Sequence, residues 1–136
     1  MIRPKEYKAG SQAVLRIVGV NRHEDPRQEF VLLQNQGTLR ARLRGHILLS
    51  EAAIESGDLE RWAYVIPDDE MIPAGLYVLV STGAGVSHWA RTKDGAHVYH
   101  AYMDRSASVW SRSEGPVHLS SLQQSFCGRR EALLLR

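Results

Sequence analysis

The sequence predicts an all-β fold, a two-sheet β-sandwich built from about seven to nine short strands. Runs of β-branched and aliphatic residues are separated by turn signals every 8–14 residues. Apart from one short stretch, no segment repeats apolar residues at the helical period. The 136 residues are 43% hydrophobic and 24% charged, which suits one globular domain. We therefore expect one domain over residues 12–136, preceded by an arm over residues 1–11.

The first two predicted strands lie in the N-terminal third of the chain. Residues 13–20 (AVLRIVGV) are rich in β-branched side chains and alternate loosely, as a first strand does. Pro26 in the polar stretch that follows predicts a turn. Residues 29–35 (EFVLLQN) are apolar enough for a central strand. Asn35 and Gly37 close that strand because both tolerate positive φ.

The next predicted strand, residues 39–46, carries a row of three arginines. Alternate residues of a strand point to opposite faces. One face would therefore hold Leu39, Ala41, Leu43 and Gly45, and the other would hold Arg40, Arg42, Arg44 and His46. A helix would scatter the arginines around its axis, so the strand is preferred.

The middle of the chain is acidic and contains the helix-like stretch. For residues 50–63 we expect a long acidic loop with one helical turn, which Ser50 could cap and Gly57 would end. Residues 62–69 predict a short strand that Pro67 stops. After a turn at Pro73–Gly75, residues 76–80 (LYVLV) are strongly β-prone.

The C-terminal part contains the remaining predicted strands. Residues 83–96 have three glycines and are expected to form a long polar loop. Residues 97–104 (HVYHAYMD) are expected to form an edge strand. A short strand through Val117 and Leu119 follows, and a hairpin with a last strand at residues 132–135 ends the chain.

A series of short motifs runs through the predicted domain in a fixed order: Glu29-Phe30-Val31-x-Leu33-x-Asn35-x-Gly37, Leu43-x-Gly45-x-x-Leu48, Tyr64-x-Ile66-Pro67, Ile72-x-Ala74-Gly75-x-x-Val78-x-Val80, Gly83-Ala84-Gly85, Trp110, and Gly115-x-Val117-x-Leu119. In order and spacing this series resembles the lamin-tail domain, the immunoglobulin-like module at the end of nuclear lamins that also occurs in many bacterial proteins. The chain departs from the pattern at His46, where an aromatic residue is often found, and residues 86–107 have no clear counterpart.

The resemblance implies an immunoglobulin-like two-sheet β-sandwich with a scaffolding or recognition role. It supplies no catalytic residues and no cofactor. The chain has no coiled-coil heptads, so it is similar to a stand-alone tail module without the filament-forming rod. We therefore expect a non-enzymatic binding or assembly module.

A protein partner or self-association is the expected mode of binding, because open sandwiches leave unpaired strand edges. Binding of nucleic acid is an alternative, and no small-molecule substrate is evident. No apolar run approaches the roughly 20 residues that span a bilayer. The first ten residues, MIRPKEYKAG, lack the apolar core of a secretory signal, so a cytoplasmic location is expected.

Two features are candidates for a binding surface. The side chains of Arg40, Arg42 and Arg44 would lie about 6.5–7 Å apart along a strand and could contact successive phosphates. The alternative is a solvated strand face that the acidic segment 51–70 balances, since the net charge is only +2. Trp89, in the predicted polar loop, is the best candidate for an exposed recognition aromatic, whereas Trp62 and Trp110 are expected in the core.

The histidines allow a second alternative, a small metal-dependent or hydrolytic enzyme that uses His88, His97 or His100. His97 and His100 would point to opposite faces of one strand and would not chelate the same ion. The sequence has no HExxH motif, no GxSxG motif and no P-loop lysine. We therefore assign no catalytic or metal-binding residue, and the lone Cys127 is interpreted as a small residue near the C-terminal strands.

Overall fold

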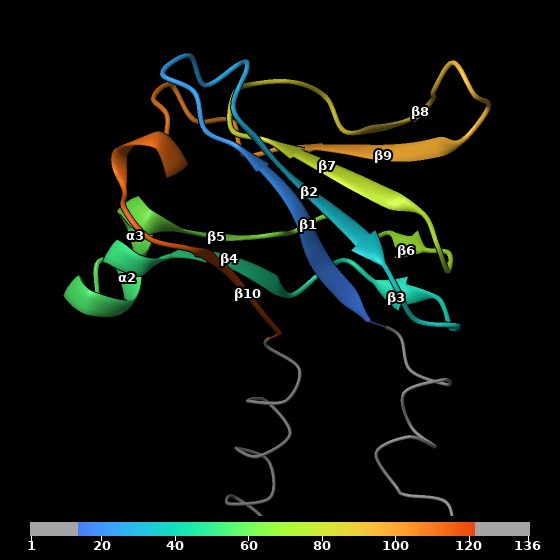
Figure 1. Cartoon of the computed structure of the whole chain (residues 1–136), viewed down its shortest axis with the longest axis horizontal. Coiled ribbons are helices and arrows are strands. Elements are labelled where there is room, and N and C mark those ends of the chain that lie inside the picture. Colours follow the sequence, from blue (N-terminus) through green and yellow to red (C-terminus); the bar gives the residue numbers. More distant parts are fainter. Residues whose placement is uncertain (1–13, 122–136) are drawn as a thin grey trace, which may run out of the picture.

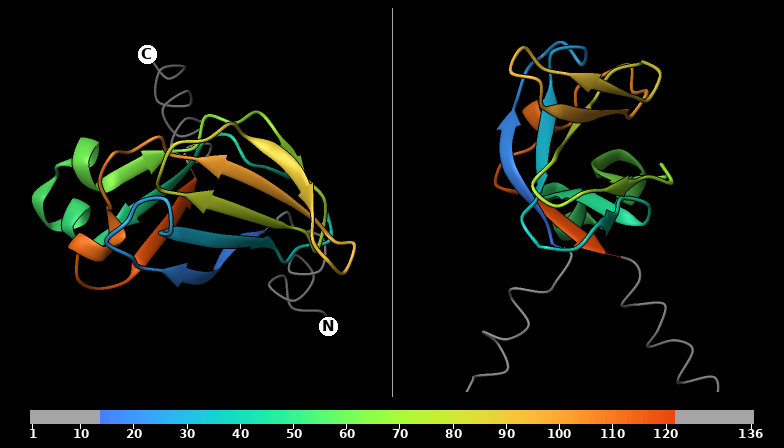
Figure 2. Two further views of the ribbon diagram at one scale, coloured as in Figure 1. Left: turned by 90° about the horizontal axis from the view of Figure 1, so that it is seen from above. Right: turned by 90° about the vertical axis from the view of Figure 1, so that its right-hand side faces the viewer.

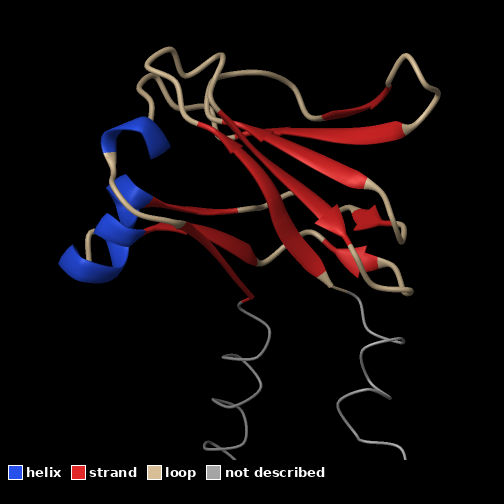
Figure 3. Cartoon of the chain, in the orientation of Figure 1, coloured by secondary structure: helices blue, strands red, loops and turns tan. Residues whose placement is uncertain are grey.

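The computed structural model describes residues 14–121, which contain ten strands, two short α-helices and one 3₁₀ helix (Figure 3). The strands form a sandwich-like all-β fold, which confirms the predicted fold class. Two of the ten strands are only two residues long. The predicted arm, Cys127 and the predicted last strand lie outside the described residues.

The larger layer is a five-stranded sheet with the order β1–β2–β7–β9–β8. Its strands are β1 (Leu15–Asn21), β2 (Phe30–Asn35), β7 (Tyr77–Ser81), β9 (His97–Tyr102) and β8 (His88–Arg91). All neighbouring strands are antiparallel except β7 and β9, which are parallel. The strand β8 therefore lies between β7 and β9 in the chain but at the edge of the sheet.

The opposite layer consists of two smaller sheets (Figure 1). One has the order β10–β4–β5, with β10 (Val117–Ser121), β4 (His46–Ser50) and β5 (Ala63–Val65). The other pairs β3 (Ala41–Arg42) with β6 (Met71–Ile72). The right-hand view of Figure 2 shows the large sheet curling over one side of these smaller sheets.

The core lies between the layers and is built from alternate residues of the strands. Trp110, from the 3₁₀ helix before β10, is the largest side chain in the described part that has no exposed surface. Side chains of this kind are excluded from water, which is the main favourable contribution to folding. The buried cluster comprises Val31, Leu33, Leu43, Leu48, Ile66, Ile72, Val78, Val80, Tyr99, Ala101, Met103, Val109 and Trp110.

Two buried polar side chains flank β2. Asn35, at its end, accepts hydrogen bonds from the backbone N–H groups of Val14 and Gly37 and donates to the carbonyls of Leu39 and Ile72. The amide oxygen of Asn35 thus accepts two hydrogen bonds and its nitrogen donates two, which is all that this side chain can form. Asn35 was predicted to close the strand, and it also fixes the loop that follows.

Glu29, just before β2, has no exposed surface and holds the 3₁₀ helix η1 (Trp110–Arg112). Its carboxylate accepts hydrogen bonds from the backbone N–H groups of Val109, Trp110 and Ser111 at 2.8–3.1 Å and from the Thr82 hydroxyl at 2.9 Å. Burial raises the pKa of Glu29, but these donors together lower it further than burial raises it, so the net shift is downward.

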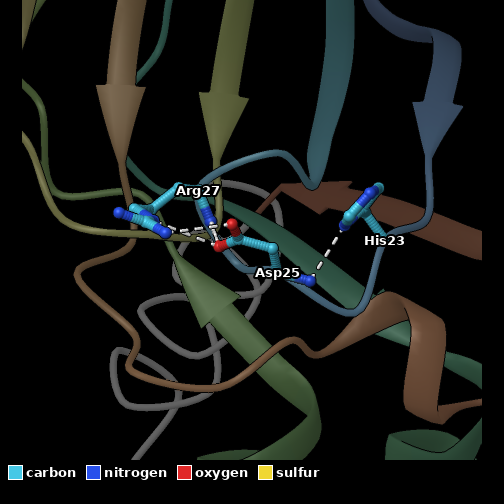
Figure 4. A network of polar contacts seen from close by, with 3 residues as sticks. All are labelled: His23, Asp25 and Arg27. Carbon is cyan, nitrogen blue, oxygen red and sulfur yellow. Dashed lines mark hydrogen bonds and ion pairs between the residues drawn. The ribbon is translucent and has the colours of Figure 1, made fainter.

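The turn between β1 and β2 positions Glu29. Figure 4 shows that the backbone N–H of Asp25 donates to the His23 ring, while the Asp25 carboxylate accepts from the backbone and the guanidinium of Arg27. The hydrogen bond to Arg27 lowers the pKa of Asp25. The backbone N–H of His23 in turn donates to Glu29. The predicted polar turn is thus a hydrogen-bonded unit.

The acidic segment is more helical than predicted. It contains α2 (Glu51–Ser56) and α3 (Leu59–Trp62) instead of a loop with one turn. Ser50 caps α2 by accepting from the Ala53 N–H, and Gly57 ends it with a φ of 77°, as predicted. Asp58 caps α3 by accepting from the Arg61 N–H, a signal that the prediction overlooked.

The predictions for residues 83–104 are wrong in two respects. Residues 83–96 do not form one long loop, because β8 lies within them. Residues 97–104 do not form an edge strand, because β9 is paired on both sides. The residues His88–Arg91 do not by themselves predict a strand. Contacts with β9 support the strand, since Trp89 packs edge-on against Tyr99.

Candidate functional site

The predicted arginine row is exposed, but its backbone is not one continuous strand. Ala41 and Leu43 are buried while Arg40, Arg42 and Arg44 are exposed, as the alternation predicts. Only Ala41 and Arg42 belong to a strand, however. The backbone changes direction at Gly45, where φ is 90°. Leu39 is 54% exposed, so the predicted apolar face is shorter than expected.

Trp89 is exposed as predicted, although it lies on a strand and not in a loop. It is 37% exposed and donates a hydrogen bond from its indole nitrogen to Glu70 at 3.3 Å. Beside it, Tyr99 donates to Asp68 at 2.7 Å, and burial together with this bond raises the pKa of Tyr99 to about 12. Trp89 therefore helps to connect β8 with the segment before β6. Trp110 lies in the core as predicted, whereas Trp62 is only half-buried.

The structure brings two of the three candidate histidines together. His88 and His100 are cross-strand partners, and their rings stack with centroids 4.9 Å apart. His97 pairs with Arg91 and points to the opposite face from His100, as predicted. Within residues 14–121, no group of three or more His, Cys, Asp or Glu side chains is placed to share a metal ion.

The side of the large sheet that faces away from the core carries no charged side chain on its central strands β2, β7 and β9. We call the outward positions of its three central strands the outer face: Phe30, Leu32, Gln34, Tyr77, Leu79, Ser81, Val98, His100 and Tyr102. None of these nine residues is Asp, Glu, Lys or Arg. The outward face of a sandwich sheet is normally polar. The left-hand view of Figure 2 looks onto this side, and no helix or strand within residues 14–121 lies over it.

The register aligns a continuous row across all five strands of this sheet. Gly19 pairs with Leu32, Leu32 with Leu79, Leu79 with His100, and His100 with His88. Cross-strand neighbours of this kind touch one another on the surface of a sheet. The row therefore joins the aliphatic middle of the outer face to the stacked histidines at the β8 edge.

The histidine end of the row is held in place by its neighbours. The Nδ1 atom of His88 lies 2.7 Å from the carbonyl of Val86, so it carries a proton and donates. Tyr102 stacks beside His88, and the backbone of Gly85 lies so close to the Tyr102 ring that an added Cβ would come within 2.4 Å of it. Burial lowers the pKa of His100, and the charge of His88 lowers it further.

A second apolar area lies on the far side of the molecule. Ile47, Leu49, Leu59, Val65 and other residues line a groove of about 410 Å³ beside β4 and β5. Glu60 and Arg105 also line this groove, so charged groups border it. The nine outward positions of β2, β7 and β9 include no such charge, although Arg16 on β1 borders them as the partner of Gln34.

The outer face was not predicted from the sequence, because it combines outward residues of three strands that are far apart in the chain. The signal was present in Phe30–Leu33 and Leu76–Val80, where apolar residues follow one another without alternation. Such runs are typical of strands covered on both sides. Here only one side is covered by residues 14–121, which leaves the other as a candidate interface.

The sequence matches no protein-family model and no curated protein. Within residues 14–121, no helix has the length and apolar character to cross a membrane.

Proposed function

We propose that this chain is a non-enzymatic assembly module that binds a second copy of itself through the outer face. The observation that carries this proposal is the lack of any Asp, Glu, Lys or Arg at the nine outward positions of β2, β7 and β9. Contiguous apolar patches of this kind are rare on monomeric proteins and mark interaction sites. Interface cores are depleted in charge and enriched in aromatic residues, as this face is.

A second copy is the partner that best fits the chemistry of this face. In a two-fold symmetric dimer, the same patch of each copy contacts the other. A patch with charges of one sign would therefore repel its counterpart. Aliphatic and aromatic side chains such as Leu32, Leu79 and Tyr102 carry no such penalty. Two sheets also pack face to face readily, as the layers of a sandwich do.

We also propose that the module is of lamin-tail type. Eleven residues of the ordered motifs have no exposed surface: Glu29, Val31, Leu33, Asn35, Leu43, Leu48, Ile66, Ile72, Val78, Val80 and Trp110. The motifs thus coincide with the core and with its two buried polar side chains. This supports a fold similar to that of the lamin-tail domain. Similarity of fold does not determine function, so the role of the module is argued from its surface residues.

The arginine row supports a second candidate function, binding of an anion or nucleic acid. Within the described part of the chain, Arg40, Arg42 and Arg44 form no ion pair with a carboxylate. A DNA-binding role predicts affinity that falls steeply with salt and is lost in Arg42→Glu. The outer face carries no basic residue that could extend such a site, so self-association remains the preferred proposal.

Sedimentation velocity across the micromolar range tests the proposed function. The wild-type chain is expected to form a dimer, and Leu79→Lys is expected to weaken the dimer by at least about thirtyfold, because it buries an unpaired charge. Val65→Lys is the matched control, since Val65 lies in the groove beside β5 and is 49% exposed. A strictly monomeric wild-type chain would refute the proposal, as would a dimer lost only in Val65→Lys.

A further inference from the structure

A small cleft lies between α3 and the loop that leads from β9 to η1. It has a volume of about 150 Å³ and is lined by Arg61, Trp62, Arg105, Ser106, Ser108 and Arg112, among others. Sites for drug-sized ligands usually measure roughly 300–1,000 Å³, so this cleft suits a small group. It is separate from the outer face, because none of its lining residues belongs to that face.

None of the three arginines of this cleft forms an ion pair with an acidic residue of the described chain. Within residues 14–121, no Asp or Glu lines the cleft. Asp104, the neighbour of Arg105 in the chain, instead accepts from the N–H of Gly85. Arg112 also borders a groove with Glu51, Glu55 and Glu114, yet its guanidinium contacts none of these carboxylates.

Two of the arginines are held in place. Arg105 donates to the carbonyls of Arg61 and Ala63 at 3.1 and 2.8 Å, which fixes its guanidinium beside α3. The guanidinium of Arg61 lies over the Trp62 ring, 4.9 Å from its centroid. Arg105 and Arg61 are thus held by neutral groups and not by carboxylates.

The loop that closes the cleft adds neutral donors. The backbone N–H groups of Ser106, Ala107 and Ser108 donate to no group within residues 14–121, and all three residues line the cleft. The Ser106 hydroxyl has no partner there either. Backbone N–H groups and arginines together are the donors that bind oxyanions in proteins.

We infer that this cleft is a binding site for a small oxyanion of the phosphate or sulfate type, free or as the terminal group of a small molecule. Arg61, Arg105 and Arg112 supply the charge, and the 106–108 loop supplies neutral donors. This inference does not depend on the proposed self-association, because the two surfaces share no residue.

Titration of the intact chain with inorganic phosphate, followed by ¹H–¹⁵N NMR, tests the inference. Saturable shifts are expected for the amides of residues 105–112 and for the Trp62 indole, and potassium chloride at equal ionic strength should not reproduce them. Arg112→Gln should weaken binding about tenfold or more, because it removes a charge-assisted contact. Arg91→Gln, which changes an exposed arginine on β8, is the matched control.

A second variant and a second ligand complete the test. Arg61→Gln should weaken binding as Arg112→Gln does, and its folded spectrum would exclude loss of structure as the cause. Tighter binding of phosphoserine than of inorganic phosphate would assign the anion to a phosphorylated molecule, whereas equal binding would assign it to the free ion. Shifts that do not saturate, or that are unchanged in both arginine variants, would overturn the inference.

Discussion

Arg22 and Glu29 hold the same short helix from its two ends. Glu29 accepts from the N–H groups of Val109, Trp110 and Ser111 at the start of η1. Arg22 donates to the carbonyls of Trp110 and Ser113 at 2.6 and 3.0 Å, and to that of Gly115 at 2.6 Å. Both residues flank the turn between β1 and β2, so that turn anchors Trp110 in the core. The stability of the sandwich should therefore depend on this pair.

Glu29→Gln should lower the free energy of unfolding by about 2–3 kcal/mol, because an amide nitrogen would face the buried N–H donors of η1. Urea denaturation measures the change. Glu60→Gln, at an exposed acid on α3, is the control and should leave stability unchanged. Equal stability of the wild-type chain and Glu29→Gln would contradict the anchoring role.

The acid side of the stability profile should also depend on Glu29. Its pKa in the folded chain is lowered from the ordinary value of 4.5, so its stabilising contribution is present above about pH 4.5 and is lost as the pH falls through the lowered pKa. Urea midpoints measured from neutral pH to pH 3 should fall in the wild-type chain. In Glu29→Gln this fall should be shallower, and an identical slope would contradict the assignment.

Arg22→Met should destabilise the fold by about 1–2 kcal/mol, because three carbonyls lose a charged donor. Combined with Glu29→Gln, the loss should be smaller than the sum of the two, because either change frees the same helix. Interacting positions typically differ from additivity by about 0.5–3 kcal/mol. Strict additivity in the double-mutant cycle would show that the two ends act independently. Arg16→Met, at an exposed arginine on β1, is the control.

Self-association should weaken in acid through His100. Its pKa in the folded chain lies below the ordinary 6.5, since burial and the neighbouring His88 disfavour its charged form. Protonation of His100 would place a charge in the proposed interface, so the affinity between copies should be highest above the lowered pKa of His100 and should fall as the pH drops through it. Sedimentation between pH 7.5 and pH 5 should show the dimer dissociating. His100→Gln should remove most of this dependence, whereas His97→Gln, on the opposite face, should not.

The sequence predicted correctly those strands, helix caps and exposed positions that are determined by residues close together in the chain. The runs at β2 and β7, the Ser50 cap and the Gly57 stop follow from residues close in the chain. The alternation of Arg40, Ala41, Arg42 and Leu43 likewise predicted their exposure correctly.

Features that depend on distant residues were not predicted. The strand β8 is supported by ring contacts with β9, and the parallel pairing of β7 with β9 follows from the crossover that contains β8. In the sequence, Glu29 resembles an ordinary strand residue. Its role depends on hydrogen bonds from backbone groups such as the N–H of Val109, 80 positions later in the chain. The extent of the outer face follows from the pairing of β2 with β7 and of β7 with β9, which the local runs of apolar residues do not give.

The most direct test of the proposed assembly is an isotope-filtered NOE experiment on a mixture of ¹³C-labelled and unlabelled chains. If the outer face is the interface, intermolecular contacts are expected from the methyl groups of Leu32, Leu79 and Val98, all of which lie on this face. Contacts confined to the β8 edge, or to Val65 and Leu59 in the opposite groove, would contradict it.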